Sequence, residues 1–248
     1  MSLKTKMTPL ILLCALITPL SLAAKQTRPN SKTKLSAVKS SCSQWSKTSK
    51  QRGISQLIIA FEGLSSFSQS YANKTYELYE AQKSGRSQNT KLKRAAMNFV
   101  MKNLIAPHMG EVVKESEILL LSEKTQRAKK ASVASTCVES WKAVYGDQLQ
   151  IIIVGHSFGG YSAINLSQRL QEKNISVKTV FTMDARTYPG KYKEFWRPDN
   201  VEQHINHFQK GAWMPGYRVK GAENKKFSTS HSGITKIEES KKAFLDII

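Results

Sequence analysis

The chain has 248 residues, which is enough for one good-sized domain and excludes a second domain of similar size. It contains 38 lysine and arginine residues against 18 aspartate and glutamate residues, so its formal net charge is +20. A charge of this size influences which partners the protein meets, because it attracts anionic molecules and surfaces.

Residues 1–24 have the three-part form of a secretory signal peptide. Lys4 and Lys6 make the first part basic, residues 10–22 are apolar, and residues 21–24 include the small residues that cleavage requires. An uncleaved membrane anchor is the alternative, but the apolar run is shorter than a membrane span requires, and two prolines bracket it. We therefore expect the signal to be removed and the protein to be secreted or periplasmic.

Residues 25–52 form a basic segment that contains no acidic residue and is rich in Ser and Thr. Its basic residues are Lys25, Arg28, Lys32, Lys34, Lys39, Lys47, Lys50 and Arg52. This composition buries too little apolar surface to offset the entropy lost on ordering, so it predicts a flexible arm. The arm can serve solubility, or it can attract anionic lipid, cell-envelope polymers or nucleic acid. Nucleic acid is the weakest of these partners, because Trp45 is the only aromatic residue among the basic ones.

Two cysteines, Cys42 and Cys137, follow the signal segment, and an exported protein meets conditions that permit disulfides. Cys137 lies at helical spacing with apolar residues that include Val138, Trp141 and Tyr145. The simpler interpretation is a buried free thiol, and a bridge between the two cysteines is the alternative. Neither cysteine is expected to be catalytic.

Apolar strands and helices alternate along the rest of the chain. Apolar runs predict strands at residues 54–61, 118–121, 151–154, 175–183 and 201–209. Helical spacing predicts helices at residues 95–104, at 126–145, after residue 160 and after residue 237, with Pro107 ending the first of them. This order is typical of an α/β fold with a doubly wound, mostly parallel sheet and helices on both faces. We expect one such domain over residues 53–248, with its ligand site at the carboxyl ends of the strands.

The sequence GHSFGG at residues 155–160 joins a buried strand to a helix. Gly155 and Gly159 flank Ser157 because a strand that turns directly into a helix strains the serine and brings its neighbours too close for a Cβ atom. Ser157 is therefore expected at the carboxyl edge of the sheet, where the amino end of the helix favours negative charge. A serine in this setting is typical of a nucleophile elbow.

This elbow, with its strand and helix, resembles that of the α/β-hydrolase family, whose lipases and esterases carry a similar G-H-S-x-G-G signature. The resemblance extends over residues 54–248 and is nearest to the exported bacterial lipase-like or esterase-like members. It implies a catalytic triad in the chain order Ser157, Asp184, His231. Asp184 ends the strand at 175–183, and His231 lies in a polar loop before the last helix, which are places where the family has its acid and its base.

Other interpretations of these residues remain open from the sequence. Asp184 can cap the turn that follows it, and His231 can be a solvated loop histidine. Asp199 and Glu202 precede their strand and so point to the wrong end of the sheet. His156 is expected to point away from the serine and to pack in the core.

A metal site is not expected. His204 and His207 lie on the same strand, but residues three positions apart in a strand face opposite sides.

The resemblance also implies an oxyanion hole made by the backbone N–H groups of Phe158 and Leu64, with Gly63 allowing close approach. The family often has a histidine where this chain has Glu62, which weakens the assignment of Leu64. Gly63 can also be an ordinary turn glycine.

We therefore expect a secreted serine hydrolase that cleaves a carboxylic ester, of the lipase, esterase or thioesterase type, through an acyl-enzyme. No cofactor and no metal are expected. The expected partners are an ester substrate, which can be a lipid, and an anionic membrane or envelope surface, and we expect a monomer. The alternative function is a catalytically silent α/β-hydrolase scaffold that binds anionic envelope or host surfaces through its basic arm. Acyl transfer to an alcohol would use the same three side chains.

Overall fold

The computed structural model describes residues 35–63, 99–122, 131–187, 194–211 and 215–248. The expected signal peptide, the first part of the basic segment and Leu64 lie outside these ranges. Within the described ranges, no helix combines the length and the apolar character that crossing a membrane requires.

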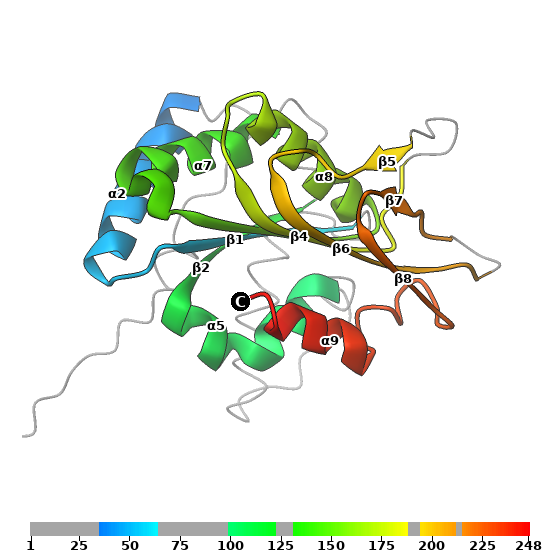
Figure 1. The fold of residues 1–248 in the computed structure, drawn as a ribbon. Helices are drawn as coiled ribbons and strands as arrows, with labels where there is room; N and C mark the ends of the chain where they lie inside the picture. Colours follow the sequence, from blue (N-terminus) through cyan, green and yellow to red (C-terminus); the bar gives the residue numbers. More distant parts are fainter. Residues whose placement is uncertain (1–34, 64–98, 123–130, 188–193, 212–214) are drawn as a thin grey trace, which may run out of the picture.

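The fold is built around a six-stranded sheet with the strand order β2-β1-β3-β4-β6-β8 (Figure 1). All neighbouring strands of this sheet run parallel. The strands are β1 (Gln56–Glu62), β2 (Ser116–Ser122), β3 (Gln150–His156), β4 (Val177–Met183), β6 (Val201–Gln209) and β8 (Glu223–Phe227). The prediction of a doubly wound α/β fold is thus confirmed, and the carboxyl ends of all six strands lie along the same edge.

The central strands β1 and β3 have apolar middles because helices cover both of their faces. Ile58 of β1 is paired with Ile118 of β2 on one side and with Ile152 of β3 on the other. Ile58 and Ile152 are fully buried, as is the neighbouring Ile59, whose side chain points to the opposite face of the sheet. Such unbroken apolar runs are what buried parallel strands require.

Helices α2 (Leu35–Gln51), α7 (Ala131–Tyr145) and α8 (Phe158–Gln171) cover one face of the sheet (Figure 1). The other face is covered by the helical segment at residues 99–115, which includes α5 (Met109–Glu115), and by α9 (Glu238–Leu245). Pro107 does not end this segment as expected. It lies in a 3-10 turn, Ala106–His108, where a proline is tolerated because early N–H groups of a turn need no partner, and α5 follows directly.

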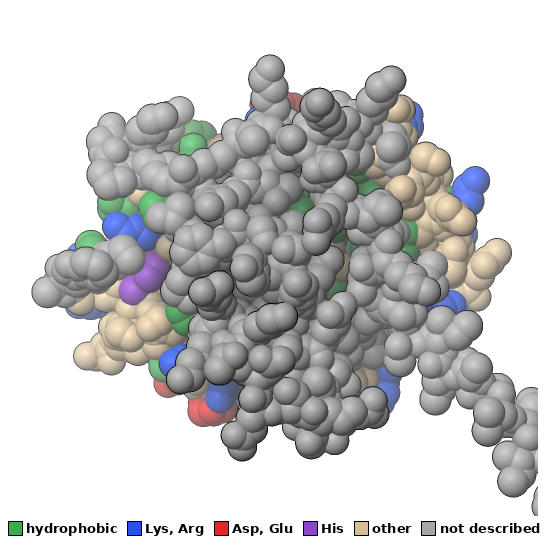
Figure 2. All heavy atoms as spheres, turned by 180° about the vertical axis from the view of Figure 1, so that it is seen from behind, with side chains coloured by type: hydrophobic (Ala, Val, Ile, Leu, Met, Phe, Trp, Pro, Cys, Tyr) green, Lys and Arg blue, Asp and Glu red, His purple; other side chains and the backbone are tan. Residues whose placement is uncertain are grey.

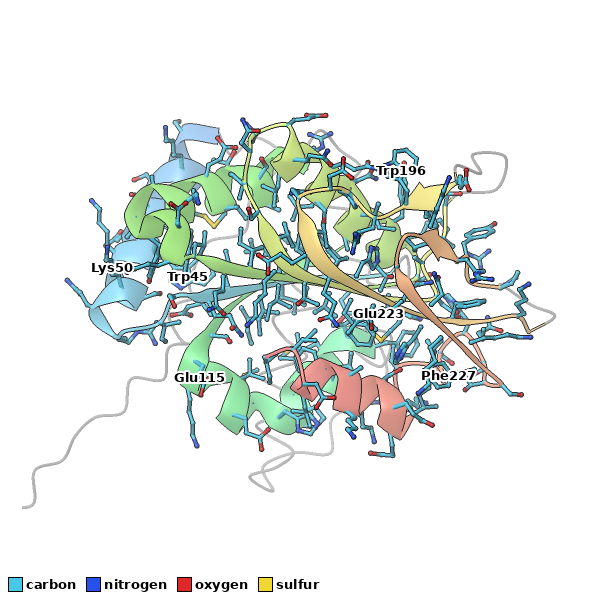
Figure 3. All side chains as sticks on the ribbon, in the orientation of Figure 1. Trp45, Lys50, Glu115, Trp196, Glu223 and Phe227 are labelled. Atoms are coloured by element: carbon cyan, nitrogen blue, oxygen red, sulfur yellow. A yellow bond between two sulfur atoms is a disulfide. The ribbon has the colours of Figure 1, made fainter. Side chains whose placement is uncertain are left out.

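The expectation of a flexible basic arm is wrong for residues 35–51, which form α2. Val38, Cys42 and Trp45 recur at helical spacing and pack in the same apolar cluster as α7. The ring of Trp45, which is labelled in Figure 3, meets that of Trp141 edge-on, with 5.0 Å between the ring centroids. The average composition of the segment hides this narrow apolar stripe, which is enough to fix the helix on α7.

Cys42 and Cys137 form a disulfide that joins α2 to α7 across 95 residues of chain. The simpler interpretation, a buried free thiol at Cys137, is therefore wrong, and the alternative is correct. In the chain-entropy model, closing a loop of this length lowers the entropy of the unfolded chain by an amount equivalent to about 4–5 kcal/mol. This contribution helps to offset the ordering entropy that had argued for a flexible arm.

Strand β8 was not predicted, because its sequence, ENKKF, is polar. It is paired with β6, and the side chain of Asn206 donates a hydrogen bond of 2.8 Å to Asn224 Oδ1 across the pair. A separate parallel pair joins β5 (Phe195–Trp196) to β7 (Val219–Lys220). The exposed ring of Trp196 lies at the outer surface of this pair (Figure 3).

Candidate active site

Ser157 lies directly after β3, at the carboxyl edge of the sheet, and its backbone is strained. Its φ and ψ angles are 60° and −126°, a backbone conformation that residues other than glycine rarely adopt. Several hydrogen bonds hold this conformation. The N–H of Ser157 donates to the carbonyl of Met183 at 2.9 Å, and its carbonyl accepts from the N–H groups of Gly160 and Arg186 at 3.0 and 3.2 Å. Such strain persists only where surrounding contacts over-determine it, and here they join β3, α8 and the segment after β4.

The glycines beside Ser157 are required by close backbone approach, as the sequence predicts. A Cβ atom on Gly155 would collide with the carbonyl of Gly159, and a Cβ atom on Gly159 would collide with the carbonyl of Phe61. A Cβ atom on Gly160 would lie 2.7 Å from that of Ala185. The turn from β3 into α8 is therefore packed directly against the ends of β1 and β4.

His231 brings together the serine and the carboxylate predicted from the sequence. Its Nε2 atom lies 2.9 Å from Ser157 Oγ, and its Nδ1 atom lies 3.0 Å from Asp184 Oδ2. An ionised carboxylate only accepts hydrogen bonds, so Nδ1 carries the proton and donates to Asp184. In the neutral ring Nε2 is then the acceptor, and the hydroxyl of Ser157 donates to it.

Asp184 is held in place by hydrogen bonds to β6 and to His231. It follows β4, is fully buried and has a φ of 48°. Its Oδ1 atom accepts the N–H of Gln209 at 2.7 Å, while its own N–H donates to the carbonyl of His207 at 2.8 Å. One carboxylate oxygen is thus fixed by the backbone of β6, which leaves the other to face His231. The rival acid Asp199 is exposed at the amino end of β6, at the other edge of the sheet.

His156 does more than pack in the core, which corrects the expectation for it. Its Nε2 atom lies 2.9 Å from the backbone carbonyl of His231, and the two rings are 4.7 Å apart between centroids. A carbonyl only accepts, so Nε2–H of His156 donates. Burial lowers the pKa of His156 to about 3, so the ring is neutral near neutral pH. No local sequence pattern indicates this contact, because its partner lies 75 residues away.

The end of β1 lies against the serine, as the proposed oxyanion hole requires. A Cβ atom on Gly63 would lie 3.0 Å from Ser157 Cβ and 3.2 Å from the carbonyl of His156. A side chain at residue 63 would therefore press on the serine turn unless its neighbours moved by a few tenths of an ångström. Phe158, the other residue assigned to the hole, begins α8 directly after Ser157. Leu64 falls outside the described residues.

Glu62, the last residue of β1, is fully buried and faces the helical segment at residues 99–105. Its carboxylate accepts the backbone N–H groups of Val100 and Met101 at 3.1 and 2.7 Å. Burial raises the pKa of Glu62 to about 7, and these hydrogen bonds oppose that rise. Glu62 thus joins the end of β1, directly before Gly63, to the helical segment at residues 99–105. This segment lies on the face of the sheet opposite to α8.

Arg186, two residues after Asp184, was not predicted to belong to the site. Its backbone N–H donates to the carbonyl of Ser157, and its guanidinium carbon lies 6.0 Å from the centre of the Phe158 ring. The only sequence signal was its closeness to the predicted acid, and that signal does not tell which way the side chain points.

His204 and His207 have structural partners. His204 Nε2 lies 3.0 Å from Thr182 Oγ1, and His207 Nδ1 lies 2.9 Å from Ser240 Oγ. Burial lowers the pKa of His204 to about 3 and that of His207 to about 4. No cluster of three or more potential metal-ligating side chains occurs in the part of the chain that the structure describes.

A scan of the chain against models of known protein families gives no match. A search of curated proteins gives no significant match either. The function is therefore inferred from the geometry of Ser157, His231 and Asp184 and of the residues that hold them.

Proposed function

We propose that the protein is a serine hydrolase that cleaves a carboxylic ester or thioester. The observation that supports this most is the continuous series of hydrogen bonds from Ser157 through His231 to the buried Asp184, at 2.9 and 3.0 Å. A nucleophile, a base within hydrogen-bond reach and a third group that orients the base form the arrangement that acyl transfer requires.

In the proposed reaction, His231 Nε2 takes the hydroxyl proton of Ser157 while Oγ forms a bond to the ester carbonyl carbon. The tetrahedral intermediate then collapses, the bond to the leaving oxygen or sulfur breaks, and His231 returns the proton to that atom. Water repeats the sequence on the acyl-enzyme, and the product acid leaves. Asp184 keeps the proton of the neutral ring on Nδ1 and stabilises the imidazolium that forms.

The developing oxyanion is proposed to be stabilised by backbone N–H groups near Ser157, those of Phe158 and Leu64. The position of Phe158 at the amino end of α8 supports its part, because a helix start favours negative charge. The close approach of Gly63 to Ser157 supports the assignment of the second donor to the next residue along the chain.

An exported location is part of the proposal. Residues 1–24 have the form of a signal peptide, and the disulfide between Cys42 and Cys137 is typical of proteins that fold under oxidising conditions.

The alternative function, binding of anionic surfaces through a flexible basic arm, receives less support. Residues 35–51 of that segment are packed on α7 as α2. The Lys and Arg side chains that are visible in Figure 2 lie at separate places around the rim of that face.

Labelling with a fluorophosphonate probe tests the proposal. We expect the folded wild-type protein to be labelled and the Ser157→Ala variant not to be. Ser167→Ala is the matched control, because Ser167 is a buried serine within α8 whose hydroxyl donates to the carbonyl of Ala163 at 2.9 Å, inside the helix. A folded wild-type protein that takes no label, or labelling that survives Ser157→Ala, would contradict the proposal.

A further inference from the structure

We propose that Arg186 binds an anionic group of the substrate, so that the protein acts on esters carrying a carboxylate or phosphate near the scissile bond. This inference rests on the proposed function of Ser157 and adds the chemical class of its substrate.

Arg186 is attached directly to the nucleophile turn. Its backbone N–H donates a hydrogen bond of 3.2 Å to the carbonyl of Ser157. Its guanidinium carbon lies 6.0 Å from the centre of the ring of Phe158, the residue that follows the serine. The positive charge therefore lies near the ring of Phe158, in the first turn of α8, on a residue whose backbone is bonded to Ser157.

Two donor atoms of the guanidinium have no acceptor among the residues that the structure describes. Its Nε and Nη1 atoms are shielded from solvent, and no described residue accepts a hydrogen bond from either. The nearest acid in sequence, Asp184, uses one carboxylate oxygen for Gln209 and the other for His231. Shielding a charged donor without an acceptor is costly, so this position favours a ligand that supplies acceptors.

Helix α8, which begins beside Arg186, makes a positive charge at this position still less favourable. Phe158 is the first residue of α8, a helix of 14 residues, and the amino end of a helix has a partial positive charge. The contact of the guanidinium with the Phe158 ring offsets only part of this cost. An anion beside Arg186 would be attracted by both the guanidinium and the helix.

The chemistry of arginine narrows the ligand to a planar or tetrahedral oxyanion. A guanidinium presents donors in a fixed fork that matches two oxygens of a carboxylate or phosphate. Although Nε and Nη1 are shielded, Arg186 as a whole is only partly buried, so part of its side chain is open to a ligand from solvent. The net charge of +20 attracts substrates of this class.

A matched pair of substrates tests the inference. These are the p-nitrophenyl monoester of adipic acid, whose acyl chain ends in a carboxylate, and p-nitrophenyl hexanoate, whose acyl chain of the same length ends in a methyl group. We expect the wild type to prefer the charged ester in kcat/KM by about 10- to 100-fold, the effect of one hydrogen-bonded charge pair. Arg186→Met should abolish that preference, because kcat/KM should fall much more on the charged ester than on hexanoate.

Arg169→Met is the control, because it removes an exposed arginine from the last turn of α8, at the end of the helix away from Phe158. It should keep the preference for the charged ester. The fluorophosphonate probe is uncharged near neutral pH, so its labelling rate in Arg186→Met reports whether the site is still assembled. Arg186→Lys, which keeps the charge without the fork, should recover only part of the preference.

Equal rates on the two esters in the wild type, or an equal loss on both in Arg186→Met, would overturn the inference and leave the proposed function standing. Binding is measured separately in Ser157→Ala, as the shift of Tm caused by monomethyl adipate or by inorganic phosphate. We expect a shift that the added Arg186→Met substitution removes, and the stronger of the two ligands identifies the anion. Absence of any shift would also overturn the inference. Failure of fluorophosphonate labelling would instead count against the proposed function.

Discussion

The carboxyl edge of the sheet and the α2–α7 pair are stabilised in different ways. At the edge, Ser157 and Asp184 both have positive φ, and buried polar groups meet in one series of hydrogen bonds. In the α2–α7 pair, buried tryptophan rings and a disulfide join the helices. Strained backbone costs about 1–3 kcal/mol per residue. The carboxyl edge therefore lowers the free energy of unfolding, and apolar packing elsewhere in the domain offsets this cost. The comparison suggests that substitutions at the edge should mainly change activity and that substitutions between the helices should mainly change stability.

The largest effect is expected from Asp184→Asn. An asparagine can still accept from Gln209, but its amide group would face Nδ1 of His231 and favour the tautomer that cannot take the serine proton. We expect kcat to fall by about 10⁴-fold with little change in Tm. Asp199→Asn, at the opposite edge of the sheet, is the matched control and should retain full activity. A loss below about tenfold in Asp184→Asn would contradict the role given to this acid.

A smaller effect, on stability alone, is expected when both Cys42 and Cys137 are changed to serine. The free energy of unfolding should fall by about 2–5 kcal/mol, measured by urea denaturation at neutral pH. Activity at low temperature should be retained, because the bridge lies between α2 and α7 and not at the site. Reduction of the wild type should reproduce the loss and leave the double variant unchanged. If the variant kept wild-type stability but lost activity, the division between the two regions would be wrong.

Glu62 links stability at the edge to pH. Its pKa is about 7 in the folded protein against 4.5 in an exposed glutamate, so the folded state holds a proton that the unfolded state has released between these values. The free energy of unfolding should therefore fall by about 3 kcal/mol as pH rises through this window. Glu62→Gln should remove this dependence of the free energy of unfolding on pH, which is measured as the difference between the variant and wild type. The control Glu115→Gln, at an exposed site, should keep the dependence. Parallel pH profiles of wild type and Glu62→Gln would refute this.

The effect of Glu62 has to be measured as a difference between wild type and Glu62→Gln, because buried histidines change the free energy of unfolding with pH in the opposite direction. His156, His204 and His207 have lowered pKa values, so they are neutral when folded and bind protons only when unfolded. Their contribution is complete above a pH of 6.5 and is lost as pH falls below it. These histidines are unchanged in Glu62→Gln, so their effect cancels in the comparison.

The smallest effect is expected at His156, which holds the backbone of the base without touching the serine. Phenylalanine would fill the space but could not donate to the carbonyl of His231, so kcat should fall by about tenfold, the effect of one hydrogen bond. Glutamine can donate a hydrogen bond there and should recover part of the loss. Equal activity of the two variants would show that His156 only fills space.

The parts of the molecule that could be predicted from sequence are those with a local pattern. The strand at residues 151–154, the glycines around Ser157 and the alternation of strands and helices are encoded in neighbouring residues, and these gave the fold class. Asp184 and His231 were proposed because of their places in the chain relative to the elbow. Their distances from each other depend on the whole sheet and needed the structure.

Features that depend on tertiary partners escaped prediction. Helix α2 was missed because Val38, Cys42 and Trp45 form a narrow stripe that becomes stable only against α7. Strand β8 was missed because an edge strand can be polar and still pair. The contacts of His156 and Arg186 join residues that are far apart in the chain, and no spacing rule indicates them.

The most direct measurement of the central claim is mass spectrometry of the protein quenched during turnover of an activated ester. The account predicts a covalent acyl group on the peptide that contains Ser157, present in wild type and absent from Ser157→Ala. Turnover of the ester without any acylated peptide, or with the acyl group on another residue, would contradict it.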